Sequence, residues 1–367
     1  MSRNSKNIYA DLAVALPPTE MEHTRLGEAG LKVSKIILGA MSYGSKDWAK
    51  WVLEEEEALP LLEHAYNVGI NTWDTADLYS DGRSEEIIAK ALEVYKIPRE
   101  NVVILTKCRW GTSVSGEPPL PLFASYVNDG RMVNRVGLSR KHIFDAVQHS
   151  VRRLGTYIDV LQIHRMDPDV PYEEVMRALN DVIENGWVRY IGASSMPAWE
   201  FQMLQTIAEK HGWHKFVSMQ NYYNLLYLEE EREMIPYCKK TGVGLIPWSP
   251  NARGLLSRPW NSNDRPSLRA NTDFALSLLF QKDDPVNQAI VTVVEEIAKE
   301  RGLPMATIST AWCLSKGVNP IVGLNSKERI DEVVKAVKLV LSEEEIVKLE
   351  AAYVPKSVVG FQSAPYR

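Results

Sequence analysis

Cysteine is scarce in this chain of 367 residues, which has only Cys108, Cys238 and Cys313. Three cysteines, odd in number and far apart, fit neither a disulfide framework nor a zinc knuckle, and they are typical of a protein from a reducing compartment. The histidines also lack the spacing of metal ligands, at His64, His142, His149, His211 and His214. We therefore expect no metal site and a cytoplasmic protein.

Long apolar runs and an excess of basic residues are absent as well. No run approaches the ~20 residues needed to cross a bilayer, and residues 1–6 lead into no apolar signal region. The 42 basic residues are outnumbered by 47 acidic ones, which gives a formal charge of -5. Such a chain has no general attraction for nucleic acid or anionic lipid, so neither is expected as a partner.

The chain does have a regular alternation of short apolar runs with longer amphipathic stretches. Its 45% hydrophobic and 24% charged residues are typical of a soluble globular protein with a large core. The apolar runs predict eight strands, at residues 35–39, 71–74, 102–107, 159–164, 190–194, 217–221, 244–248 and 320–323. The amphipathic stretches predict helices at residues 55–67, 84–93, 140–154, 172–184, 199–211, 229–240, 287–301, 305–315 and 327–337. Left-handed glycines are expected after several helices, at Gly69, Gly186, Gly242 and Gly302.

This alternation predicts a barrel. Strands that alternate with helices pair in parallel through right-handed crossovers, and eight such units can close a (β/α)8 TIM barrel. Residues 24–27 and 31–33, which flank residues 28–30, predict a β-hairpin cap before it. We expect a polar N-terminal segment over residues 1–22 and a single barrel domain over residues 23–367, with a C-terminal helix and tail. Long loops are expected on the C-terminal face, at residues 109–136, residues 251–284 and after Val354.

Four polar side chains stand where the first predicted strands end: Asp74, Tyr79, Lys107 and His164. Because all strands of such a barrel point their C-terminal ends to one face, these side chains should meet there. Any one of them is well explained as a polar residue that caps a strand, but the four together favour a site. Cys108 follows Lys107 and should point away from it by strand alternation, as a buried structural thiol.

The four residues suit proton transfer to a carbonyl oxygen. An unpaired buried ammonium is very unfavourable, so Lys107 needs a carboxylate, and Asp74 is its natural partner. A free phenol loses its proton at a pH of about 10, but a nearby ammonium stabilises the phenolate, so Tyr79 can exchange a proton near neutrality. A neutral His164 can orient the carbonyl by a hydrogen bond. The set favours carbonyl reduction with hydride from a bound cofactor.

Residues 69–80, with Ser84 and Glu85 following, resemble the active-site segment of the aldo-keto reductases. Residues 105–107 resemble the lysine strand of that family, residues 161–164 its histidine strand and residues 191–195 the strand that meets the nicotinamide. Further matches follow in the family's order, at residues 219–222, 247–250 and 323–329. The resemblance implies a (β/α)8 barrel that binds NADPH without a Rossmann motif. Within this family, the residues of these motifs are most similar to those of the aryl-alcohol dehydrogenase and potassium-channel β-subunit branches.

By this resemblance Asp74, Tyr79, Lys107 and His164 form a catalytic tetrad. The implied cofactor-binding residues are Gly39, Met41, Asp74, Ser194, Ser195, Gln220, Trp248, Ser249, Arg253, Gly254, Gly323, Lys327 and Arg329. Trp248 matches the aromatic residue that stacks on the nicotinamide. Arg329 matches the arginine that holds the 2'-phosphate, and its planar fork suits that anion, so NADPH is favoured over NADH.

Three positions depart from the commoner family pattern. Ser195 stands where many members have Asn, Gly323 where many have Lys at the phosphate, and Val333 where an Asn often contacts adenine. The last two weaken the expected hold on the adenosine phosphate. Lys327 either compensates or is a solvated helix charge, and the spacing favours neither.

We therefore expect an NADPH-dependent oxidoreductase that reversibly reduces aldehydes or ketones, aromatic ones included, with Tyr79 as proton donor. Its partner is a small carbonyl or alcohol substrate, and candidate pocket residues are Trp48, Trp51 and Trp110. The alternative is a cofactor-binding regulatory subunit of the channel β-subunit type with little turnover. The sequence leaves the substrate, the favoured direction and the oligomeric state open.

Overall fold

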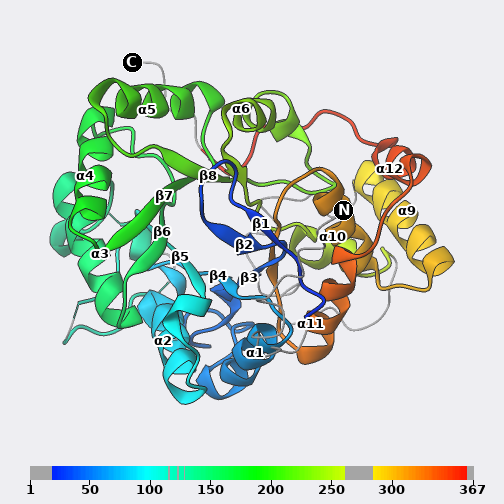
Figure 1. The fold of residues 1–367 in the computed structure, drawn as a ribbon, viewed down its shortest axis with the longest axis horizontal. Helices are drawn as coiled ribbons and strands as arrows, with labels where there is room; N and C mark the ends of the chain where they lie inside the picture. The colour runs from blue at the N-terminus through cyan, green and yellow to red at the C-terminus, as the bar shows by residue number, and fades with distance from the viewer. Residues whose placement is uncertain (1–18, 115, 122–123, 128, 261–283, 362–367) are drawn as a thin grey trace, which may run out of the picture.

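Eight parallel strands curl into a barrel that is surrounded by helices (Figure 1). The computed structural model describes residues 19–114, 116–121, 124–127, 129–260 and 284–361. The strands are β3 (Ile37–Gly39), β4 (Thr72–Asp74), β5 (Val103–Cys108), β6 (Ile158–Ile163), β7 (Val188–Ser194), β8 (Phe216–Gln220), β9 (Gly244–Leu245) and β10 (Ile321–Gly323). Their order is β10-β3-β4-β5-β6-β7-β8-β9, and a parallel bridge between Trp248 and Ile321 joins its two ends. The predicted (β/α)8 barrel is confirmed.

The helices alternate with the strands as the amphipathic pattern predicts. They are α1 (Glu55–Asn67), α2 (Arg83–Val94), α3 (Arg140–Leu154), α4 (Tyr172–Glu184), α5 (Ala198–His211), α6 (Met234–Thr241), α9 (Pro285–Arg301), α10 (Met305–Ser315), α11 (Lys327–Val334) and α12 (Glu343–Glu350). The bounds of α1, α3, α4 and α10 are those predicted. The four glycines expected after helices all have positive φ, from 62° at Gly302 to 95° at Gly69. Part of the expected loop at 251–284 and most of the segment 1–22 lie outside the described residues.

Four predicted helix starts differ from the structure: α5 begins one residue earlier and α9 two residues earlier than predicted, and α6 and α2 differ for local reasons. The helix expected from residue 229 begins at Met234, after a 3-10 turn over Glu229–Glu231. Pro236 accounts for this, because proline fits the first turn of a helix but not its interior. Helix α2 begins at Arg83, behind Gly82 with φ 89°, so Ser84 is not its cap. The hydroxyl of Ser84 donates instead to the carbonyl of Ala40 at 2.9 Å.

The predicted hairpin closes the N-terminal end of the barrel. Strands β1 (His23–Arg25) and β2 (Lys32–Ser34) pair antiparallel and lie across the barrel opening in Figure 1. Leu26 and Val33 are fully buried against an inner apolar cluster that includes Ile37, Leu105 and Val160. The hairpin is thus the plug of the barrel interior.

A larger apolar core lies between the outer side of the barrel and the helices, and it contains Trp73, Phe201, Trp312 and the buried Cys108. Burial raises the pKa of the Cys108 thiol well above its ordinary value, so this thiol is inert, as its place in the strand predicts.

The packing of the hairpin against the barrel requires a glycine at position 27, which can be tested. This residue has φ 59°, and a Cβ added to it would lie 2.2 Å from the carbonyl oxygen of Gly242. We expect Gly27→Ala to lower the free energy of unfolding by about 2–4 kcal/mol, from left-handed strain and backbone overlap. Gly30→Ala, in the same hairpin with nothing within 4 Å of an added Cβ, should stay within about 0.5 kcal/mol. Urea unfolding followed by circular dichroism measures both, and equal effects would contradict the packing of the plug.

Candidate functional site

A buried ion pair stands at the centre of the C-terminal face. Asp74 is the last residue of β4, and Lys107 of the adjacent β5 is fully buried. The Lys107 Nζ donates to Asp74 Oδ1 at 2.5 Å and to the carbonyl of Thr75 at 2.8 Å. Burial alone lowers the pKa of Lys107, but Asp74 and Tyr79 outweigh it and raise the pKa above its ordinary value. The ammonium is therefore charged at neutral pH.

Two glutamines hold the second oxygen of Asp74. The amides of Gln162 on β6 and Gln220 on β8 donate to Asp74 Oδ2 at 3.0 and 2.8 Å, and Gln220 also donates to Gln162 Oε1 at 2.9 Å. The role of Gln162 is missed by the sequence interpretation. A signal existed, because Gln162 precedes His164 by two residues and alternation places both on one side of the strand.

Tyr79 meets the ion pair from a short turn after β4. Lys107 Nζ donates to its hydroxyl oxygen at 3.2 Å. The turn is strained, since Ser80 and Asp81 have φ of 50° and 56°, a conformation that costs about 1–3 kcal/mol per residue. Neighbouring loops hold it: Ser80 Oγ accepts from Ser45 N at 3.0 Å, and Asp81 accepts from Leu120 N at 2.9 Å. Strain and anchors together fix the direction of the phenol.

His164 follows β6 and packs its ring edge-on against Tyr79, with 5.9 Å between ring centroids. Burial, with the nearby charges of Lys107, Arg165 and Arg109, lowers the pKa of His164 well below its ordinary value. Its Nδ1 is buried without a hydrogen-bond partner among the described residues. A proton on this nitrogen would make no hydrogen bond, so the neutral imidazole is expected to carry its proton on Nε2. From there it can donate a hydrogen bond into the pocket. The four residues predicted to meet do so.

Ser194, Ser195 and Trp248 form a group beside the ion pair. The hydroxyl of Ser194, at the end of β7, donates to the carbonyl of Gln220 at 2.8 Å. The indole nitrogen of Trp248 donates to Ser195 Oγ at 3.1 Å, and Tyr222 stacks on Trp248 with 4.4 Å between centroids. These contacts fix the orientation of Trp248, and Tyr222 is a member that sequence reasoning missed.

The C-terminal tail also reaches this group. A Cβ added to Gly360 would lie 3.5 Å from Trp248 Cζ2 and 3.6 Å from Ser195 Oγ, and Val359 N donates to the hydroxyl of Tyr227 at 3.1 Å. No local sequence signal announces this contact, because it joins segments far apart in the chain.

The expected phosphate residues form a second group. The loop after Trp248 has positive φ at Ser249 (56°), Ala252 (45°), Arg253 (54°) and Gly254 (104°), a backbone geometry that can turn amides toward an anion. Arg329, exposed on α11, donates to Asn325 Oδ1 at 2.6 Å. Burial, and after it the charge of Arg329, lower the pKa of Arg258. The two cations therefore act on each other electrostatically, and Arg258 is a candidate that sequence reasoning missed.

The remaining predicted contacts border these groups. Gly39 and Gly323 are paired at the ends of β3 and β10, and a Cβ on Gly39 would lie 3.0 Å from Ile321 Cγ2. Met41 is half-buried in the next turn, and Lys327 is exposed at the start of α11. Val333 is buried in the outer core.

Aromatic side chains stand around Tyr79. The rings of Trp48 and Tyr79 are 6.4 Å apart, those of Trp48 and Trp51 6.2 Å, and those of Trp110 and Tyr126 4.4 Å. The three predicted pocket tryptophans are all half-buried. Tyr126 is an addition from the long loop after β5.

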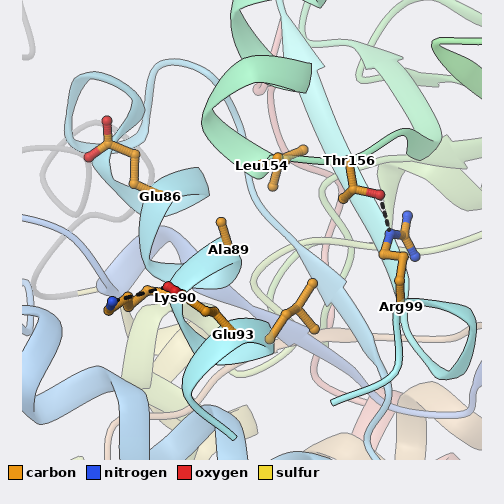
Figure 2. A pocket seen from close by; sticks show the side chains of 9 residues that line it. Glu86, Ala89, Lys90, Glu93, Arg99, Leu154 and Thr156 are labelled. Atoms are coloured by element: carbon orange, nitrogen blue, oxygen red, sulfur yellow. Dashed lines mark hydrogen bonds and ion pairs between the residues drawn. The ribbon is translucent and has the colours of Figure 1, made fainter. Parts of the chain in front are cut away.

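A separate hollow lies at the other end of the barrel (Figure 2). It is lined by residues of α2, the end of α3 and Arg99, which precedes β5. Arg99 is already engaged there by Thr156 at 3.1 Å and Asp159 at 2.6 Å. In barrels of this kind the active site lies at the opposite, C-terminal end of the strands.

Within the described ranges, no group of three or more His, Cys, Asp and Glu side chains is arranged to hold a metal ion. Among the same residues, no helix combines the length and the apolar character that spanning a membrane requires.

Comparison with known proteins agrees with the site. Residues 35–354 match the model of the aldo/keto reductase family. Versiconal hemiacetal acetate reductase of Aspergillus parasiticus is 61% identical over 340 residues, which cover 92% of this chain and 98% of that protein. A Schizosaccharomyces pombe protein provisionally named an aryl-alcohol dehydrogenase is 54% identical over 345 residues, or 91% of this chain and 96% of the relative.

The lowered pKa of His164 predicts a ring that stays neutral in the folded protein. Its NMR ring signals, assigned through their loss in His164→Gln, should not titrate as the pH falls from 8 to 5.5. In urea the same ring should titrate near a pH of about 6.5. Because the unfolded chain then binds the extra proton, the contribution of His164 to stability falls as the pH drops below about 6.5. A folded-state midpoint at or above the unfolded one would contradict this environment.

Proposed function

Because this chain belongs to the aldo/keto reductase family, whose chemistry is carbonyl reduction, we propose that it is an NADPH-dependent enzyme that reversibly reduces aldehydes or ketones to alcohols. The observation that carries the proposal is the buried chain of contacts from Asp74 through Lys107 to the Tyr79 hydroxyl, beside a neutral His164. Such a chain delivers a proton to an oxygen atom without a metal ligand set.

In the proposed mechanism Tyr79 donates its proton to the substrate oxygen as hydride reaches the carbonyl carbon. Lys107 stabilises the phenolate that forms, since its Nζ already donates to the Tyr79 oxygen. Asp74 keeps Lys107 charged and in place. His164 donates from Nε2 to the carbonyl oxygen and aligns it with the phenol. In the oxidation direction the same groups take the proton from the alcohol.

The residues beside the tetrad fit a nicotinamide cofactor, which supplies the hydride when bound. Ser194, Ser195 and Gln220 offer hydroxyl and amide groups for its carboxamide, and Trp248 is held in one orientation as a flat platform. Gly39, at the end of β3, and Met41, in the turn that follows, lie on the same C-terminal face of the barrel. Asp74 contributes through its hold on Gln220.

A cofactor with an extra phosphate is favoured by the second group of residues. Burial and the positive charge of Arg329 both lower the pKa of Arg258, and a 2'-phosphate bound by these two cations would favour their charged forms. Ser249, Arg253 and Gly254 line the left-handed loop that would cross the pyrophosphate. In this proposal Arg258 supplies the positive charge that Gly323 lacks, and the role of Lys327 is decided by the second test below.

The named relatives narrow the proposed substrate class. One relative is named for the reduction of a hemiacetal acetate and another for aryl alcohols. Together with the tryptophans around Tyr79, these names support aromatic aldehydes and alcohols as substrates of this chain.

The first test replaces the proposed proton donor. Tyr79→Phe should lower the turnover of benzaldehyde by about 10²–10⁴-fold, the usual worth of a general acid, and leave the NADPH dissociation constant within about threefold. Tyr95→Phe, remote from the site at the end of α2, is the matched control and should change neither quantity.

Stopped-flow absorbance and fluorescence titration measure the two quantities. Turnover in Tyr79→Phe equal to the unaltered protein would refute the role of the phenol. Tight NADPH binding with almost no turnover in the unaltered protein would favour the regulatory subunit instead.

The second test concerns the 2'-phosphate. Arg329→Ala should weaken NADPH by roughly 10- to 100-fold, the value of a charge-assisted contact, and change NADH by less than about threefold. Lys327→Ala decides whether that lysine contributes, and exposed Lys335, just past α11, provides the control. Equal losses for both cofactors would place the phosphate elsewhere.

A further inference from the structure

Arg165 is a cation of the pocket that the proposed mechanism does not use. It follows His164 directly and is half-buried. Its Nη1 donates to the carbonyl of His164 and to Ser194 Oγ, the latter at 3.1 Å. Its guanidinium carbon lies 5.8 Å from the centre of the Trp248 ring. The side chain therefore lies between the proposed carbonyl-binding histidine and the nicotinamide platform.

Among the residues that the structure describes, Arg165 differs from the other deeply placed cations in having no carboxylate partner. Arg99 pairs with Asp159 at 2.6 Å, Arg153 with Glu85 at 2.6 Å and Lys107 with Asp74 at 2.5 Å. Within the described part of the chain Arg165 forms no ion pair, and its Nε and Nη2 donate to no protein group. These N–H groups form the end of a planar fork, which suits two oxygens of one anion.

The surrounding charge does not neutralise Arg165. Burial lowers its pKa to about 10, so it stays charged at neutral pH. The carboxyl whose charge acts on Arg165 is that of Glu230, and burial raises the pKa of Glu230 to about 7. Because such a carboxyl is only partly ionised at neutral pH, the pocket keeps a positive field, and a cation desolvated without an anion is costly.

Aromatic rings stand on the same side of the pocket. Tyr126 packs at a tilt against Trp110, with 4.4 Å between ring centroids. Burial raises the pKa of Tyr126, and the charge of Arg165 opposes that rise in part. Trp48 lies against Tyr79. An arene in this space would have its aldehyde carbon at Tyr79 and a ring substituent near Arg165.

We propose that Arg165 determines substrate choice by binding an anionic oxygen group, a carboxylate or an ionised phenol, on the ring of an aromatic aldehyde. This inference rests on the proposed carbonyl reduction and names the substrate class of that site. A purely structural Arg165 would only hold Ser194 in place, and it would affect neutral and anionic substrates alike.

The kinetic test compares 4-formylbenzoate with its neutral methyl ester, and 3-formylbenzoate and 4-hydroxybenzaldehyde extend it to another position and to phenolate. The unaltered enzyme should favour the carboxylate in kcat/KM. Arg165→Met should lower kcat/KM for the anion by roughly 10- to 100-fold, mainly through KM, with the ester within threefold. Arg165→Lys should recover part of the loss, and Arg189→Met, exposed at the start of β7, is the control. Equal losses on both substrates overturn the proposal.

A binding test separates this proposal from the proposed reaction. Isothermal titration with benzoate and with benzyl alcohol, with and without NADP, requires no turnover. Benzoate should bind at least tenfold more weakly to Arg165→Met than to the unaltered protein, with benzyl alcohol unchanged. If no aldehyde is reduced, the reaction proposal fails while this difference still supports the anion site. Benzoate binding that is unchanged by the substitution overturns it.

Discussion

The ion pair between Lys107 and Asp74 is the contact on which the rest of the site depends. Both charges are withdrawn from water, and loss of one partner from such a pair costs about 3–5 kcal/mol, because the other is left uncompensated. The hydrogen-bonding groups around both charges must therefore be placed accurately. Gln162 and Gln220 hold Asp74, and the carbonyl of Thr75 holds Lys107. The register of four strands, β4, β5, β6 and β8, is thereby tied to one carboxylate.

The barrel supplies the accuracy that this pair requires. Parallel strands bring Asp74, Lys107 and Gln220 to one rim, while the plug at Leu26 and the outer helices supply the stability that offsets strain. Strain is concentrated at the rim, in the left-handed residues Ser80 and Ser195. The well-packed N-terminal end of the barrel thus stabilises a fold whose C-terminal end is polar and strained.

The sequence predicts much of this and misses what depends on distant contacts. Periodicity predicts α1, α3 and α4 because one face of each is buried, and strand ends predict the tetrad. The start of α6 is predicted wrongly because Pro236 outweighs the amphipathic pattern. The action of Arg329 on Arg258 and the contact of Gly360 with Trp248 arise only in the folded chain. No local pattern can reveal such meetings.

The pairing of Gly39 with Gly323 joins an early and a late part of the chain, which matters during synthesis. The first barrel strand leaves the ribosome early, whereas β10, which covers one of its edges, is among the last segments to be made. Throughout synthesis the nascent sheet therefore carries open edges at β3 and at its growing end, and such edges invite pairing with other chains. The edge of β3 is covered only when β10 has been made and has paired with it.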